Sequence, residues 1–195
     1  SDPEALDILN HSTAHVMAHA VQEIFGKGVK VAIGPAIDKG FYYDFLRDEP
    51  FTPDDFEKIE QKMTEICRQG LPFSRTEISS EDAIKRFEGE GEKYKVELIK
   101  DLDTPNVTLY QQGNFADLCR GPHLPNTSLI NSFKLLRVAG AYWRGDENND
   151  VLQRIYGTSF YDKKELKKHL TALEEAKKRD HRKVGKALKL FTIQD

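Results

Sequence analysis

Two pairs of side chains in the sequence could share chemistry. His11 and His15 are four residues apart in a segment with helical periodicity, so both imidazoles should project from one face of a helix. Cys119 and His123 have the same spacing about a Gly-Pro turn that can bring thiol and imidazole together. Together they provide the four soft or borderline ligands of a tetrahedral Zn²⁺ site. Because residues 16–118 separate the pairs, a shared site must be formed by the tertiary fold.

Each pair alone also has a structural interpretation. Histidines four apart on an amphipathic helix commonly belong to a core or a surface, and we interpret His19, which continues the spacing, as structural. A metalloprotease helix fits poorly, because the residue after its first histidine should be glutamate and here it is Ser12. A zinc finger also fits poorly, since it begins with a cysteine pair and closes within roughly thirty residues.

An acid and a lysine could complete such a site. Asp117 lies two residues before Cys119, and in an extended segment the two side chains would face the same side. A carboxylate beside imidazoles would hold one of them protonated or fix its tautomer. Considered singly, Asp117 is an ordinary acid at a strand end, and Lys95 is an ordinary exposed lysine.

The elements that must position these residues can be located from capping residues and periodicity. Asp2-Pro3-Glu4 is typical of a helix start, and Gly26 predicts that this helix ends at Phe25. Further helices are expected at 53–69, from Ser80 as a cap to 87, and at 92–100. Strands are expected at 29–35, 40–45, 107–110, 115–118, 133–139 and 152–156. Because no βαβ period repeats, we expect an α+β fold with antiparallel sheet.

From Asp162 onward the pattern changes to one long basic helix. Asp162 and Glu165 have the spacing of a capping box, and a stripe of leucines follows. Residues 163–189 contain 11 Lys and Arg against 4 Asp and Glu, whereas the whole chain has a formal net charge of -3. A polyanion could dock on this segment, although a solvated helix face has the same composition. We place a boundary near Tyr161.

The composition limits the class of protein. The chain has 195 residues, of which 38% are hydrophobic and 31% are charged. This length can bury a sizeable core, but no apolar run approaches the ~20 residues that span a bilayer. The first ten residues are polar and acidic, unlike a signal peptide. With only two cysteines, a reducing cytoplasm is the expected location.

The order of several motifs resembles the threonyl-tRNA synthetase family. The motifs are H-S-T-A-H, A-I-G-P-A-I-D-K-G-F-Y-Y-D-F, Y-K-V-E-L, D-L-C-R-G-P-H, A-G-A-Y-W-R-G-D and L-Q-R-I-Y-G-T, followed by E-A-K-K-R-D-H-R-K-V-G. The resemblance extends from about Leu9 to the end of the chain. The two metal-type pairs are shared with the editing domains of the alanyl-tRNA synthetases.

The resemblance implies a function for each part of the chain. Residues 1–161 would be the editing domain shared by the two families, with antiparallel sheets packed against helices. Residues 162–195 would be a basic linker helix that leads toward a class II catalytic core. The activity implied is hydrolysis of serine wrongly esterified to threonine tRNA, with the acceptor end of that tRNA as partner. The full-length enzyme would be a homodimeric threonine–tRNA ligase, and only that enzyme would use ATP.

The resemblance also assigns the site residues. It implies that His11, His15, Lys95, Asp117 and His123 are catalytic. Lys95 and Asp117 would position and polarise the water, His11 would lie near the terminal ribose, and the other two histidines would hold the seryl group or transfer protons. Cys119 would be structural or a ligand rather than a nucleophile. No cofactor is required on this interpretation. Zinc, if bound, would be held by His11, His15, Cys119 and His123.

Two other functions remain open at the level of sequence. One is an alanyl-type hydrolase that removes serine from alanine tRNA. The other is a non-catalytic module that binds zinc or tRNA, which would leave Lys95 and Asp117 without a role beside the pairs.

Overall fold

The computed structural model describes residues 2–187, and a long N-terminal helix lies at its centre. This helix, α1 (Pro3–Phe25), begins where the Asp2 carboxylate accepts a hydrogen bond from the Glu4 N–H at 3.0 Å. It ends at Gly26, whose φ of 78° suits glycine. From Leu9 to Val21 every residue except His11 is buried, so α1 must be covered on several sides.

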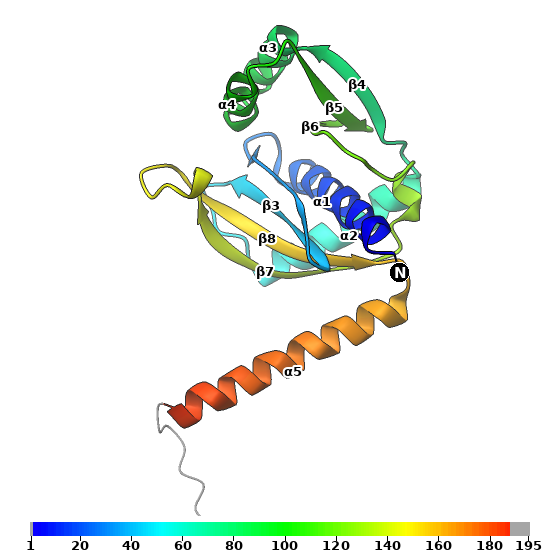
Figure 1. Ribbon diagram of the computed structural model, residues 1–195, viewed down its shortest axis with the longest axis vertical. Helices are drawn as coiled ribbons and strands as arrows, with labels where there is room; N and C mark the ends of the chain where they lie inside the picture. Colours follow the sequence, from blue (N-terminus) through cyan, green and yellow to red (C-terminus); the bar gives the residue numbers. More distant parts are fainter. Residues whose placement is uncertain (1, 188–195) are drawn as a thin grey trace, which may run out of the picture.

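The larger sheet covers one side of α1. Its strands are antiparallel in the order β1-β3-β8-β7, and β2 pairs with β3 in addition. Helix α2 packs beside α1 on the same face, and the main hydrophobic core lies between these helices and the sheet (Figure 1). The bounds are β1 Lys30–Val31, β2 Ala36–Ile37, β3 Gly40–Leu46, α2 Pro53–Gln69, β7 Ser132–Tyr142 and β8 Val151–Phe160.

The smaller sheet covers the opposite side of α1 (Figure 1). It is antiparallel in the order β4-β5-β6, and α3 and α4 enclose a second core against it, which includes Phe87, Ile99 and Leu109. The central helix is therefore enclosed between two sheets. The bounds are β4 Ser74–Ser79, α3 Ser80–Glu90, α4 Lys93–Leu102, β5 Asn106–Gln112 and β6 Phe115–Leu118, with 3₁₀ turns at Thr127–Leu129 and Trp143–Gly145.

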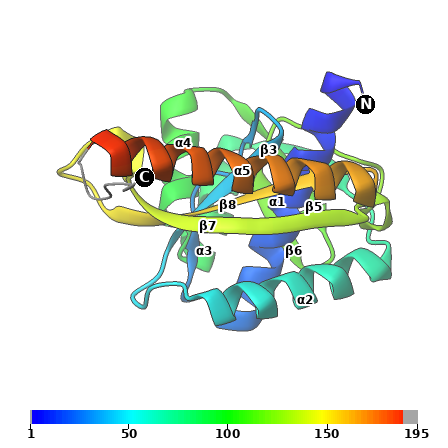
Figure 2. The ribbon, with the colours of Figure 1, turned by 90° about the horizontal axis from the view of Figure 1, so that it is seen from below.

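The basic helix α5 (Lys163–Ala187) follows β8 directly. It lies along β7 and β8 (Figure 2). Its leucines are half-buried, and the ring of His169 packs on Phe160 with centroids 5.1 Å apart. The last eight residues of the predicted linker helix, 188–195, lie outside the described residues. Within 2–187, no helix is both long and apolar enough to cross a membrane.

The α+β fold with antiparallel sheets is confirmed, two local predictions need correction, and one strand was not expected. The strand expected at 29–35 is reduced to β1, because Gly34-Pro35 interrupts the extended segment. Helix α3 is capped by Ser79, whose hydroxyl accepts the Asp82 N–H at 3.1 Å, and not by Ser80. Strand β4 was not predicted, since its residues are polar and largely exposed.

Candidate active site

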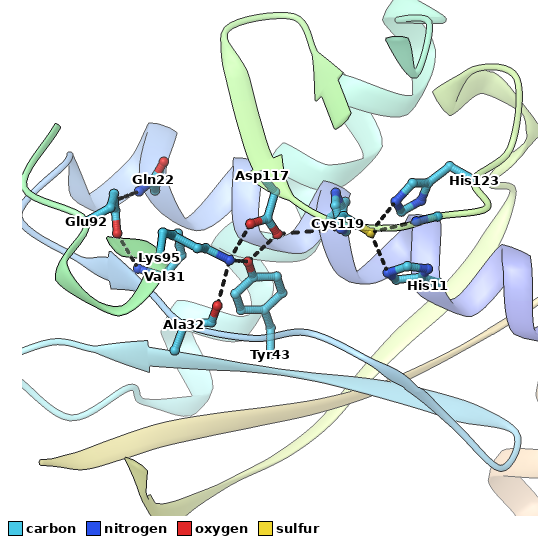
Figure 3. Close-up of polar contacts among 12 residues, drawn as sticks. His11, Gln22, Val31, Ala32, Tyr43, Glu92, Lys95, Asp117, Cys119 and His123 are labelled. Atoms are coloured by element: carbon cyan, nitrogen blue, oxygen red, sulfur yellow. Dashed lines mark hydrogen bonds and ion pairs between the residues drawn. The ribbon is translucent and has the colours of Figure 1, made fainter. Parts of the chain in front are cut away.

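The two metal-type pairs converge beside the middle of α1. The Cys119 thiol lies 3.2 Å from His11 Nε2 and 3.3 Å from His123 Nε2 (Figure 3). The His15 ring is 4.2 Å from that of His123, centroid to centroid. One donor atom from each of the four side chains lies within 4.8 Å of the others. The fold therefore brings together residues that are far apart in the sequence.

The segment after β6 holds the second pair in place. The chain turns at Gly121, with φ 72°, and the Gly121–Pro122 peptide is cis. A side chain at Gly121 would collide with the hydroxyl of Tyr110, so only glycine allows this close approach. The Gly121 N–H donates to the Cys119 thiol at 3.2 Å. These contacts turn Cys119 and His123 back toward α1.

His123 is fixed by contacts on three sides. Its ring stacks on Phe73 with centroids 5.1 Å apart, and Tyr110 packs edge-on at 4.6 Å. The Ser12 hydroxyl accepts the Leu124 N–H at 2.9 Å and lies 3.0 Å from His123 Nδ1. The hydroxyl therefore forms a hydrogen bond with the His123 imidazole, and which of the two groups donates depends on the tautomer of the ring.

A second group of contacts joins Lys95, Asp117 and Tyr43. Lys95 forms an ion pair with the Asp117 carboxylate, and its ammonium donates to the Ala32 carbonyl at 2.6 Å and to the Tyr43 hydroxyl at 3.1 Å. Tyr43 in turn donates to Asp117 Oδ2 at 2.5 Å (Figure 3). All three side chains are almost completely buried. The two charges thus neutralise each other inside the fold.

His15 connects the two groups. Its Nε2 lies 3.5 Å from Asp117 Oδ2, whereas its Nδ1 is buried without a hydrogen-bond partner among the described residues. His15, Lys95 and Asp117 are 1–2% exposed, while His11, Cys119 and His123 are half-buried. A substrate therefore has to approach from the side of Cys119.

Burial keeps the cluster uncharged. Desolvation lowers the pKa of His11, and it lowers those of His15 and His123 much further, with neighbouring imidazoles adding to the shift in His15 and His123. Desolvation raises the pKa of the Cys119 thiol to about 12. Since the thiolate is the nucleophilic form, Cys119 is poorly suited to covalent catalysis. The neutral imidazoles remain available to accept hydrogen bonds or a proton.

The four donors fit a zinc ion. Bond lengths of about 2.0–2.3 Å in a tetrahedral site place ligand atoms roughly 3.3–3.8 Å apart, close to the two thiol–imidazole distances. His15 Nδ1 has a free lone pair, and its Nε2 faces a carboxylate, as in many metal-bound histidines. The cluster could therefore bind a metal such as zinc.

Several side chains in this site were not singled out in the sequence. Tyr43 belongs to an aromatic strand and gives no sign that its hydroxyl meets a carboxylate. Phe73 and Tyr110 are ordinary apolar positions until His123 lies between them. His19, as expected, is outside the cluster, because its Nε2 contacts Asn114 at 2.8 Å and Glu23 at 3.2 Å.

Comparisons with known proteins show which sequences this chain resembles. Residues 107–156 match the "Threonyl and Alanyl tRNA synthetase second additional domain". The threonine–tRNA ligase of Citrifermentans bemidjiense is 61% identical over 193 residues, which are 99% of this chain. The chain is homologous to one region of the threonyl-tRNA synthetases. The corresponding ligases of Geobacter sp. and Syntrophotalea carbinolica are 61% and 57% identical over 99% and 100% of the chain.

The region of similarity is only part of these relatives. It spans about 30% of the length of the curated ligases that it matches. The matched domain contains β5 from its second residue, β6, Cys119 and His123, whereas α1 and Lys95 lie outside it. The resemblance expected from the motifs is therefore confirmed. The ligases match the whole chain, and the matched domain covers the pair Cys119 and His123.

Proposed function

We propose that this synthetase region hydrolyses the ester that links serine to the terminal adenosine of threonine tRNA. The observation that carries the proposal is the convergence of three neutral imidazoles with a buried Lys95–Asp117 pair at a half-exposed cluster. Neutral imidazoles can accept a proton from water, and the buried Lys95–Asp117 pair holds a carboxylate oxygen beside His15. Both features favour ester hydrolysis by an activated water.

Magnitudes explain why a ligase for threonine would need such a site. Serine differs from threonine by the loss of one methyl group, and one methyl contributes roughly 1–3 kcal/mol, or about 10–200-fold discrimination. A second site that admits serine, but in which the extra methyl group of threonine would be overpacked, would supply the remaining discrimination between the two amino acids.

The proposed roles follow from position. His11, half-buried beside Cys119, contacts the terminal ribose. Lys95 and Asp117 position and polarise the water, and His15, held beside Asp117, accepts its proton together with His123. Cys119 orients the two imidazoles that its thiol contacts and does not form a covalent intermediate.

The reaction is proposed to proceed without a metal, although the cluster can accept one. A bound zinc ion would supply a more acidic water in such a site. We expect hydrolysis to persist in protein treated with a chelator and shown to be zinc-free by elemental analysis. Loss of activity on chelation that zinc alone restores would contradict this.

The rest of the chain is proposed to serve the same reaction. Residues 1–161 would be the editing domain, and the segment from Asp162 would link it to a catalytic core whose dimerisation would make the full-length enzyme a homodimer. The lysines of α5 from Lys163 to Lys178 are exposed and would lie along the acceptor arm of the tRNA. The protein would act in the cytoplasm.

His11→Ala tests the proposal with little effect on the fold. His11 is half-buried, so we expect the folded variant to have lost hydrolysis of seryl-tRNA. His169→Ala is the matched control, since His169 is half-buried against Phe160 at the opposite side of the larger sheet. Lys95→Ala should be equally inactive, with folding checked by circular dichroism. Full activity in His11→Ala would end the assignment.

The family match favours one alternative substrate, because the matched domain occurs in both threonyl- and alanyl-tRNA synthetases. An alanyl-type hydrolase would remove serine from alanine tRNA. Parallel assays on the two misacylated tRNAs distinguish the cases, and preference for seryl-alanine tRNA would replace our proposal. A non-catalytic zinc module would hydrolyse neither and would unfold on chelation.

A further inference from the structure

The tip of the β7–β8 hairpin has no part in the proposed hydrolysis, yet it packs against the helix that carries Lys95. The tip consists of residues 143–150, between the last residue of β7 and the first of β8. Trp143 is 4% exposed, and its ring lies 4.8 Å from that of Tyr94 in α4, centroid to centroid. Its indole N–H donates to the Glu97 carboxylate at 3.1 Å. The single tryptophan of the chain is thus buried against α4.

Arg144 extends this interface toward the C-terminal end of α4. Its guanidinium forms ion pairs with Glu97 at 3.0 Å and with Asp101. The φ of Arg144 is 56°, a left-handed backbone conformation that residues other than glycine rarely adopt. Such a conformation persists where the surrounding contacts fix it. The conformation of the tip is therefore set by its contacts with α4.

Asp150 extends the interface toward the N-terminal end of α4. Its carboxylate accepts hydrogen bonds from the Lys93 ammonium at 2.6 Å and from the Tyr94 hydroxyl at 2.8 Å. The charged residues that the tip contacts in α4 are four apart and form one stripe along the helix, namely Lys93, Glu97 and Asp101. Because exposed ion pairs add little stability on their own, their clearer effect is to fix the rotation and height of α4 against the tip.

Helix α4 needs such support from outside. It has ten residues, and an isolated helix of fewer than roughly 12–15 residues is marginal in water. Its N-cap residue, Glu92, makes no side-chain capping hydrogen bond, and its carboxylate accepts the Val31 N–H at 3.1 Å instead. The second core holds one face of α4 through Val96 and Ile99. The hairpin tip holds another face.

The same interface reaches both ends of the Lys95 side chain. Lys95 follows Tyr94 directly in α4, and its ammonium donates to the Ala32 carbonyl at 2.6 Å. Ala32, Tyr94 and Trp143 belong to one small apolar cluster. A displaced tip would therefore shift both the backbone of Lys95 and the carbonyl that its ammonium meets. We propose that residues 143–150 position Lys95 for hydrolysis, with Trp143 as the principal positioning residue, an inference that rests on the proposed function.

The split between kcat and KM for seryl-tRNA tests this role. The tip makes no hydrogen bond, ion pair or ring contact with the two metal-type pairs among the described residues, so its loss should leave KM nearly unchanged. Trp143→Ala should lower kcat by about 10- to 100-fold, since a displacement of about 1 Å can cost 10²-fold. Trp143→Phe keeps a ring against Tyr94 and should recover most of this loss. A wild-type kcat in Trp143→Ala, or a rise in KM alone, would overturn the proposal.

Arg144→Ala keeps the test valid if removal of the buried tryptophan harms folding, because Arg144 is exposed. Its kcat should fall by about 3- to 30-fold, since the tip is only loosened. Arg47→Ala is the matched control. Arg47 also pairs with two carboxylates, those of Glu49 and Asp55, and lies over the Phe25 ring at 4.1 Å, but none of these partners is in α4. Arg47→Ala should keep the wild-type kcat, and an equal fall in both variants would overturn the proposal.

The ¹⁵N NMR signal of the Lys95 ammonium separates this proposal from the proposed function. The ammonium is buried among three polar partners, so its signal should differ from those of exposed lysines. It should move toward them in Trp143→Ala and Arg144→Ala, and should not move in Arg47→Ala. If the wild-type protein fails to hydrolyse seryl-tRNA, the proposed function fails, while this shift still supports the positioning of Lys95. If hydrolysis is observed and the signal moves in none of the variants, the positioning role is wrong and the proposed function stands.

Discussion

Tyr43→Phe removes a single hydroxyl from the buried contact between Lys95 and Asp117 (Figure 3). That hydroxyl donates to Asp117 Oδ2 at 2.5 Å and accepts from Lys95 Nζ at 3.1 Å, and Tyr43 is 0% exposed. Burial and the nearby carboxylate raise the pKa of Tyr43 well above its usual value, so the group remains a donor.

The expected cost follows from these contacts. A hydrogen bond to a charged group contributes about 1.5–3 kcal/mol, while the ion pair and the bond from Lys95 to the Ala32 carbonyl remain. We expect the free energy of unfolding to fall by about 1.5–3 kcal/mol. In a domain of this size each kcal/mol lowers Tm by roughly 2–4 °C, which gives a fall of about 3–12 °C.

The adjacent tyrosine is a matched control. Tyr42 lies on the opposite face of β3, its hydroxyl makes no hydrogen bond with the described residues, and its ring contact with Arg154 at 3.9 Å is kept in phenylalanine. Tyr42→Phe should change stability by less than about 0.5 kcal/mol. Urea denaturation of both variants measures the difference. Equal stabilities would refute the view that the Tyr43 hydroxyl supports the charged pair.

Three further outcomes are expected. In chelator-treated protein the free energy of unfolding should decrease as pH falls below about 6.5, because the lowered pKa values of His11, His15 and His123 let only the unfolded chain bind these protons. The decrease should be up to about 1.4 kcal/mol per pH unit for each histidine, which denaturation series at pH 5–8 would measure. Ser12→Ala should lower stability by about 1–3 kcal/mol by leaving the Leu124 N–H unpaired, and should change the tautomer of His123 seen in ¹⁵N NMR spectra. Affinity for tRNA should fall steeply as the salt concentration rises. Replacing the exposed Lys167 and Lys168 by alanine should reduce the slope of log K against log salt concentration by about two. An unchanged slope would mean that this helix face is only solvated.

The helices were predictable because their end signals are local. Asp2 with Gly26, and Thr52 with Gly70, bound α1 and α2 where the sequence indicated, since capping depends on neighbours in the chain. The strands were less predictable. Strand β4 has no alternation of apolar and polar residues, and it forms because β5 supplies its hydrogen-bond partners.

The types of the four possible metal ligands could be predicted from the sequence. The contacts among Lys95, Asp117 and Tyr43 could not. Regular spacing was enough to pair His11 with His15 and Cys119 with His123. The burial of Lys95 was not predictable, because a lysine is normally exposed and becomes stable inside only when a carboxylate meets it. The position of the Tyr43 hydroxyl depends on the packing of β3 against β6 and α4, which no local pattern encodes.

The most direct measurement is the rate at which the 195-residue chain releases amino acid from threonine tRNA charged with serine, compared with the same tRNA charged with threonine. The cluster at His11, Lys95 and Asp117 predicts release of serine far above the spontaneous rate and release of threonine close to it. Release of serine no faster than in buffer, or equal release of both amino acids, would contradict an editing hydrolase.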